Sequence, residues 1–274
     1  MQRSLILALS LTVAAIAPAC GDTEPTKDVG AADSGATDSG PKADVSGDSG
    51  SAGALACLPA GGNLVGTENI VENCVLAADT VGKVYLIDSL VVTDPPNDAL
   101  LSQLNTLWAS DLESDNLIIL FHIVSRDDDT GTSLVKVGTG ILENDIYRFE
   151  GVPTDMALNV DACSYSTSAP VNLSLSPASL NKPVHMTDVD VCGQTSADAT
   201  AIPFSYLTGS IRKADAMGVE VSINPDAPEF TVDLADLLES FVDMDTDSDG
   251  DGENDAWELR GTLTGTAITN FESE

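Results

Sequence analysis

An acidic stretch near the C-terminus contains the residues whose types and spacing best suit a defined chemistry. Residues 243–258 have the sequence DMDTDSDGDGENDAWE, with eight carboxylates in sixteen positions. Carboxylates this close together repel one another, so such a run is stable only in solvent or around a cation. From Asp247 onward it matches the pattern D-x-D-x-D-G-x5-E, whose spacing supplies the oxygen ligands of a calcium ion.

The spacing assigns a role to each position of this loop. Calcium takes six to eight oxygen ligands, so a short loop must fold back on itself to supply them, and Gly252 stands where the sharp turn is needed. Alternate side chains from position 247 point inward, and the last acidic residue closes the shell with both of its oxygens. The predicted ligands of Ca2+ are the carboxylates of Asp247, Asp249, Asp251, Asp255 and Glu258 and the backbone carbonyl of Glu253.

The loop resembles the EF-hand loop and, nearly as well, the aspartate-rich loops of thrombospondin type 3 repeats. It departs from the EF-hand at Asn254, where that family has an aliphatic residue, and after the loop, where the Gly/Thr-rich residues 259–265 favour a strand over a helix. The chain has no second such loop, which predicts a lone helix–loop–strand site. A register starting at Asp245 fits less well because it puts Ala256 at the closing ligand, and a solvated acidic loop without metal is the alternative.

Composition limits the classes of function. The chain has 274 residues, enough for one or two domains, and a formal net charge of −33 with only 11 lysines and arginines. Such a charge repels phosphate backbones and excludes nucleic acid as a partner. Hydrophobic residues make up 43% of the chain, enough for a core, whereas 4% aromatic residues are too few for an aromatic binding platform.

The N-terminus has the organisation of an export signal. A short basic segment precedes the twelve largely apolar residues 5–16, which are too few to span a bilayer, so residues 1–19 are predicted to be a signal peptide. Ala17 and Ala19 fit ordinary cleavage, but Cys20 directly after them resembles the lipobox of bacterial lipoproteins, although that family prefers leucine where Ala17 stands. Acylation of Cys20 would leave four of the five cysteines, an even number suited to an oxidising compartment.

Residues 20–56 are predicted to be the lipidated cysteine followed by a disordered tether. The segment is rich in Asp, Ser and Gly and has almost no large apolar residue, so it cannot form a core. Residues 47–50, GDSG, resemble the nucleophile motif of chymotrypsin-like proteases. That family places its histidine upstream of the nucleophile, but His122 and His185 both lie downstream, so no protease is predicted.

Residues 57–274 are predicted to form one mainly β body. Short β segments separated by turns favour a β-sandwich or jelly roll with two short helices, one capped by Asn97 or Asp98 and one capped by Asp233. The second helix leads into the calcium loop. The strands are predicted at residues 83–93, 116–125, 133–142, 157–164, 170–175, 184–191, 204–212, 217–223 and 259–271. Residues 116–125 are nearly all apolar and predict a strand buried on both faces.

The remaining candidates for chemistry are the histidines, the strand glycines and the cysteines. His122 lies within the apolar run and is predicted to be a hydrogen-bonded core histidine rather than a metal ligand. Gly138 and Gly140 are predicted to be strand glycines rather than part of a dinucleotide motif. Local pairing predicts the disulfides Cys57–Cys74 and Cys163–Cys192, although four cysteines allow three pairings.

These features together predict an exported, lipid-anchored, calcium-binding protein of the bacterial envelope, at the outer membrane or cell surface. No catalytic motif is present, which favours a non-enzymatic binding or structural module for an extracellular protein or glycan. The alternative is a calcium-dependent extracellular hydrolase that uses a glycosidase-like pair of carboxylates.

Overall fold

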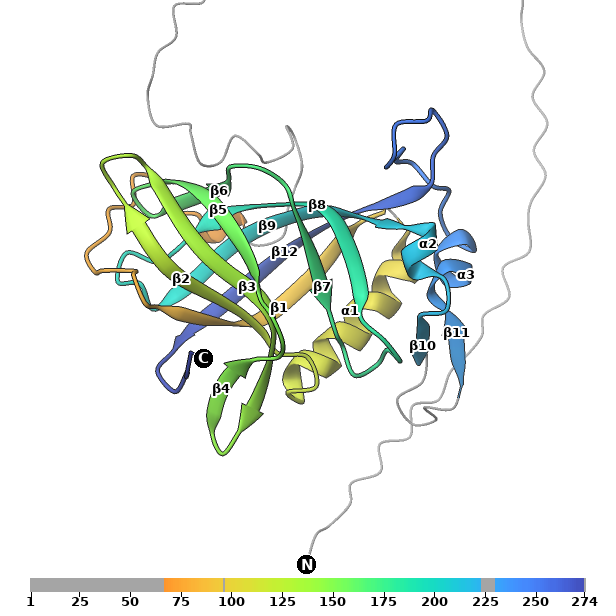
Figure 1. The fold of residues 1–274 in the computed structure, drawn as a ribbon, viewed down its shortest axis with the longest axis horizontal. Coiled ribbons are helices and arrows are strands. Elements are labelled where there is room, and N and C mark those ends of the chain that lie inside the picture. The colour runs from red at the N-terminus through yellow and green to blue at the C-terminus, as the bar shows by residue number, and fades with distance from the viewer. Residues whose placement is uncertain (1–66, 96, 223–229, 274) are drawn as a thin grey trace, which may run out of the picture. The chain divides into compact units, whose positions relative to one another are not determined.

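The computed structural model describes residues 67–95, 97–222 and 230–273, and antiparallel strands dominate them (Figure 1). In chain order the elements are the 3-10 helix Thr67–Asn69, β1 (Val84–Asp94), α1 (Asp98–Glu113), β2 (Ile119–Asp127), β3 (Thr132–Glu143), β4 (Ile146–Phe149), β5 (Thr154–Asp161), β6 (Ser164–Thr167), β7 (Val171–Leu175), β8 (Val184–Gln194), β9 (Ala201–Arg212), α2 (Lys213–Ala216), β10 (Glu220–Ser222), β11 (Thr231–Asp233), α3 (Leu234–Glu239) and β12 (Ala256–Ile268).

Eight of the strands close into an antiparallel barrel. Their order is β2-β1-β12-β9-β8-β6-β5-β3, and β3 pairs back onto β2. β4 and β7 extend from this ring by pairing with β3 and β8, and β10 and β11 form a separate two-stranded sheet. The expectation of a mainly β body is confirmed, but the expected sandwich or jelly roll is wrong. The alternation of residues along a strand predicts which of its faces is buried but not which strand it pairs with. Here the first strand, β1, pairs with the last, β12, so that Val84 lies opposite Ile268.

The barrel interior is filled by side chains. On β5, for example, Met156 and Leu158 are buried while Asp155 and Ala157 between and beside them are exposed, as the two-residue period of a strand requires. The cavity that remains among the inward-facing residues is about 40 Å³. An eight-stranded barrel is just wide enough for its own side chains, so this interior is a core.

A second, smaller core covers part of the barrel's outer surface. Leu120 on β2 and Val84 on β1 pack there against Phe149 of β4 and Phe271 of the C-terminal segment. Because β2 contacts the main core on one face and this smaller core on the other, its apolar residues are buried on both faces, as predicted. Gly140 of β3 is needed at this point, because a Cβ atom there would lie only 2.7 Å from Leu120 Cδ1.

The helices extend the main core at one end of the barrel. Asn97 caps α1 by accepting the N–H groups of Ala99 and Leu100 (both 3.1 Å), and Asp233 caps α3 through the N–H of Ala235, which confirms both predicted caps. The described residues contain three α-helices rather than the two expected, because the four-residue α2 follows β9. None of the described helices is long and apolar enough to cross a membrane.

One disulfide joins segments that the sequence places far apart. Cys74, in the segment before β1, is bonded to Cys163 in the turn between β5 and β6, across 89 positions. The predicted local pairs are therefore wrong, because barrel closure brings residues near position 74 beside β6 and β8. Cys192 on β8 is also disulfide-bonded. Cys57, like Cys20 and the predicted signal peptide and tether, lies outside the described residues.

Candidate metal site

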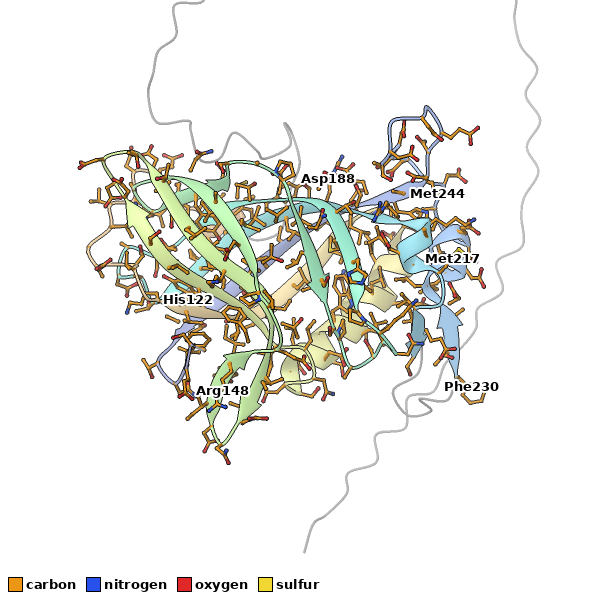
Figure 2. The ribbon with its side chains drawn as sticks, in the orientation of Figure 1. His122, Arg148, Asp188, Met217, Phe230 and Met244 are labelled. Atoms are coloured by element: carbon orange, nitrogen blue, oxygen red, sulfur yellow. A yellow bond between two sulfur atoms is a disulfide. The ribbon has the colours of Figure 1, made fainter. Side chains whose placement is uncertain are left out.

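The predicted calcium loop connects α3 to β12, so the expected helix–loop–strand arrangement is present. The base of the loop is closed by an antiparallel bridge between Thr246 and Ala256, with Ala256 N donating to the Thr246 carbonyl at 3.0 Å. Below the bridge, the fully buried Trp257 donates from Nε1 to the carbonyl of Val242 (3.4 Å). The loop extends outward from the barrel beyond Met244, which is labelled in Figure 2.

Backbone N–H groups hold the first aspartate of the loop in place. Asp247 accepts from Gly250 N through Oδ1 (2.7 Å) and from Gly252 N through Oδ2 (2.8 Å). Both glycines have positive φ, +80° and +95°, so the backbone turns here as Gly252 was expected to allow. Hydrogen bonds from Gly252 and then Gly250 favour the charged form, and they lower the pKa of Asp247 below its ordinary value.

Three of the predicted ligands converge in the structure. Asp247, Asp249 and Asp251 can each place one carboxylate oxygen within 4.8 Å of the others. Asp249 and Asp251 are oriented by the N–H groups two residues further on, those of Asp251 (3.2 Å) and Glu253 (2.9 Å). Each bonded oxygen keeps a second lone pair, so the hydrogen bonds leave the carboxylates able to bind a cation.

The remaining predicted carboxylates lie outside this group of three. Asp255 accepts from Ser248 through both oxygens, from the N–H and from the hydroxyl, each at 2.8 Å. These bonds lower its pKa, while the neighbouring charge of Asp247 acts in the opposite direction. Glu258 lies on β12, where Oε2 accepts from Arg260 at 2.7 Å and its backbone N–H donates to Asp245. The carbonyl of Glu253 belongs to the loop and accepts no hydrogen bond from the described residues.

Arg260 is a neighbour of the site that the sequence analysis missed. It bridges Glu258 and Asp94, the latter at 3.2 Å, and so ties β12 to the end of β1. A signal was available in the sequence, because residues two apart on a strand point to the same face and Glu258 and Arg260 are so spaced.

Except for Glu258, which is paired with Arg260, the carboxylates of the loop have no cationic partner among the described residues. Within the described residues, no lysine or arginine forms an ion pair with any acidic residue from position 243 to 255. Exposed carboxylate oxygens on a turn are the donors that hard divalent cations prefer, and they suit neither zinc nor a soft metal. The residues present therefore fit a hard divalent cation, the class to which calcium and magnesium belong.

The two histidines lie far from this loop in sequence, His122 on β2 and His185 on β8. His122, half-buried, lies in the outer core rather than inside the barrel, with its ring centroid 5.2 Å from that of Phe271 (Figure 2). Burial first, and the nearby Lys136 second, lower its pKa, so the ring is neutral near pH 7. His185 is exposed on β8, with Nδ1 2.7 Å from Ser174 Oγ.

Comparison of the chain with protein-family models, with curated proteins and with solved structures finds no match.

Proposed function

We propose that this protein is an exported, lipid-anchored protein of the bacterial envelope whose loop at residues 243–258 binds one Ca2+ ion. The observation that carries the proposal is the convergence of three aspartate carboxylates, oriented by backbone N–H groups, none of which has a cationic partner among the described residues. Repulsion among these charges destabilises the turn until a divalent ion neutralises them.

Asp247, Asp249 and Asp251 form the core of the proposed shell. The Glu253 carbonyl, Asp255 and Glu258 complete it, as the spacing predicts. The lone loop has no partner loop to preorganise it, so we expect weak affinity, a Kd on the order of 10⁻⁴ to 10⁻³ M, as in extracellular modules. Magnesium should stabilise less because it requires a tighter octahedral shell and gives up water reluctantly.

The module is proposed to bind or to support other envelope components rather than to catalyse a reaction. A cavity of about 480 Å³ beside α1 contains one carboxylate, Asp111, among its lining residues. Glycosidase-like hydrolysis needs two carboxylates about 5–9.5 Å apart, so this cavity does not support the hydrolase alternative. A protein or glycan outside the cell is the proposed partner class.

Thermal unfolding with calcium, magnesium or chelator tests the metal site. At ten times Kd, calcium should add about 1.4 kcal/mol to the free energy of unfolding. For a domain of this size that raises Tm by roughly 3–6 °C. Asp247→Asn should remove the calcium effect, whereas Asp243→Asn, an exposed change of the same charge outside the pattern, should keep it. Equal wild-type midpoints in calcium and chelator, with no heat of binding in calorimetry, would refute the site.

A second pair of variants identifies the ligand that closes the shell. In the structure Glu258 is held by Arg260, so it must exchange this partner for the ion. If Glu258 is a ligand, Glu258→Gln weakens calcium binding and Arg260→Gln strengthens it by removing the competing cation. If neither variant changes the affinity, Glu258 serves only the contact between β12 and β1.

A further inference from the structure

A cavity lies against helix α1, apart from the metal loop. Its volume is about 480 Å³, within the range of small-molecule sites, roughly 300–1,000 Å³. α1 forms one side, and the connection between β7 and β8, strand β10 and helix α3 form the others. Figure 1 shows α1 below the barrel with the short elements β10, β11 and α3 at its side.

A buried carboxylate occupies the wall of this cavity. Asp111 is 6% exposed, and its Oδ2 accepts the N–H of Ser179 at 3.1 Å. Its Oδ1 has no hydrogen-bond partner among the described residues, and no lysine, arginine or histidine lines the cavity. A buried carboxylate without a counter-charge is costly, because protein surroundings solvate it less well than water does.

The hydroxyl of Ser179, beside Asp111, is a buried polar group without a hydrogen bond. Ser179 uses its backbone N–H for Asp111, but its hydroxyl is buried and makes no hydrogen bond in the structure. Asp111 Oδ1 is not among the fully buried unpaired atoms, so it is open to the cavity that Asp111 lines, and a partner that enters the cavity can bond to it. That partner must donate hydrogen bonds and carry positive charge.

The rest of the cavity selects among cationic ligands. α1 contributes the hydroxyls of Thr106 and Ser110, and Asn116 follows at its end, so most of the polar lining is neutral. Leu107 and Leu237 provide an apolar patch for carbon atoms. A simple metal ion would leave these groups unused, whereas a small molecule with one amine and several hydroxyls would use all of them.

We propose that this cavity binds a small polyhydroxylated amine of the amino-sugar class. The ammonium group donates to Asp111 Oδ1, and the sugar hydroxyls bond with the exposed hydroxyls of α1. The ring carbons face Leu107 and Leu237. This inference rests on the part of the proposed function in which the protein is a binding module, and it is independent of the metal loop.

Titration calorimetry on the full chain tests the proposal with three matched sugars. Glucosamine carries the ammonium group, glucose lacks it and N-acetylglucosamine replaces it with a neutral amide. At mildly acidic pH, where the amine is protonated, we expect glucosamine to bind roughly tenfold or more tightly than either neutral sugar, because hydrogen bonds between charged groups are the stronger ones. Equal binding of glucosamine and glucose, or no binding of glucosamine, would overturn the proposal.

Variants separate a binding role of Asp111 from a structural one. Asp111→Asn keeps an oxygen for the Ser179 N–H but removes the charge, so glucosamine affinity should fall to that of glucose. Glu113→Gln makes the same change of charge at an exposed position of α1 outside the cavity and should leave the affinity unchanged. Retained selectivity for glucosamine in Asp111→Asn would contradict the assignment.

A cavity-filling variant covers the case in which Asp111→Asn does not fold. Ser110 is exposed, and Ser110→Phe should block the cavity and abolish glucosamine binding without touching the buried carboxylate. Unchanged binding in Ser110→Phe would place the sugar elsewhere and overturn the proposal. The change in Tm of the same samples on adding calcium reports on the metal loop separately. A protein that calcium stabilises but that does not bind glucosamine would therefore refute only the proposed ligand of the cavity.

Discussion

Removal of the Cys74–Cys163 disulfide should cause a large loss of stability. The bond closes a loop across 89 positions of the chain. In the chain-entropy model a loop of this length restricts the unfolded state by about 4.6 kcal/mol. This is an upper figure for the chain, because Cys192 is in a second disulfide that already restricts the unfolded state. At 2–4 °C per kcal/mol, Tm falls by roughly 9–18 °C when the bond is removed.

The double variant Cys74→Ala/Cys163→Ala, followed by circular dichroism on heating, measures this effect. Alanine avoids placing a hydroxyl at the buried Cys163. Two hydrogen-bonded contacts should keep the segment before β1 in place in the variant: Val71 N donates to Gln194 Oε1 (2.9 Å), and Ala77 N donates to the Ala197 carbonyl (2.7 Å). The native fold should therefore persist at low temperature.

Two results would refute this reasoning. Peptide mapping of the oxidised wild-type protein that links Cys74 to a residue other than Cys163 would show that the segment before β1 does not cross to the β5–β6 turn. A decrease in Tm of less than about 2 °C in the double variant would show that loop closure does not contribute to stability here.

The remaining predictions concern the anchor, the second disulfide and the acid limit of the metal loop. Acylated Cys20 should place the wild-type protein in the membrane fraction and Cys20→Ser should release it or leave the precursor uncleaved; a soluble wild-type protein with unmodified Cys20 would refute the anchor. Peptide mapping should join Cys192 to Cys57, since a Cys20–Cys192 link would leave no cysteine for the lipid. Hydrogen bonds lower the folded-state pKa of Asp247 and Asp255. The two carboxylates therefore contribute to stability above the pKa of an unfolded aspartate, about 3.9, and the contribution is lost as pH falls through their lower folded-state pKa values. Calcium binding measured by calorimetry should persist at pH 5 and fail only below about pH 4.

The sequence predicted local structure well because local structure depends on neighbouring residues. Residues 83–93 form β1 within one position of the prediction, and the strands predicted at residues 116–125 and 133–142 correspond to β2 and β3. Asn97 and Asp233 were predicted as helix caps because a short polar side chain before an apolar period satisfies the first free N–H groups of a helix. Asp247 and Gly252 take their expected places because the turn depends on residues only five apart.

The features that the sequence did not predict depend on contacts between distant segments. The pairing of β1 with β12 joins residues more than 160 positions apart, as in Val91 opposite Thr262, and decides between a barrel and a sandwich. The Cys74–Cys163 bond depends on the same closure. Glu258 was assigned to the loop alone because its position in the pattern is local, whereas its contact with Asp94 through Arg260 requires the neighbouring strand.

The position of the acidic loop gives metal binding a route to the stability of the barrel. The loop ends in β12, which pairs with β1 on one side and with β9 on the other. Its base is fixed to the core by Trp257 and to β1 by the bridge from Arg260 to Asp94. Charge repulsion within the loop therefore acts on the first residues of a central strand, where fraying would expose both neighbouring strands to solvent. Neutralising that charge should stabilise the closed sheet as well as the loop, so a weakly bound ion on an exposed turn can raise the Tm of the whole barrel.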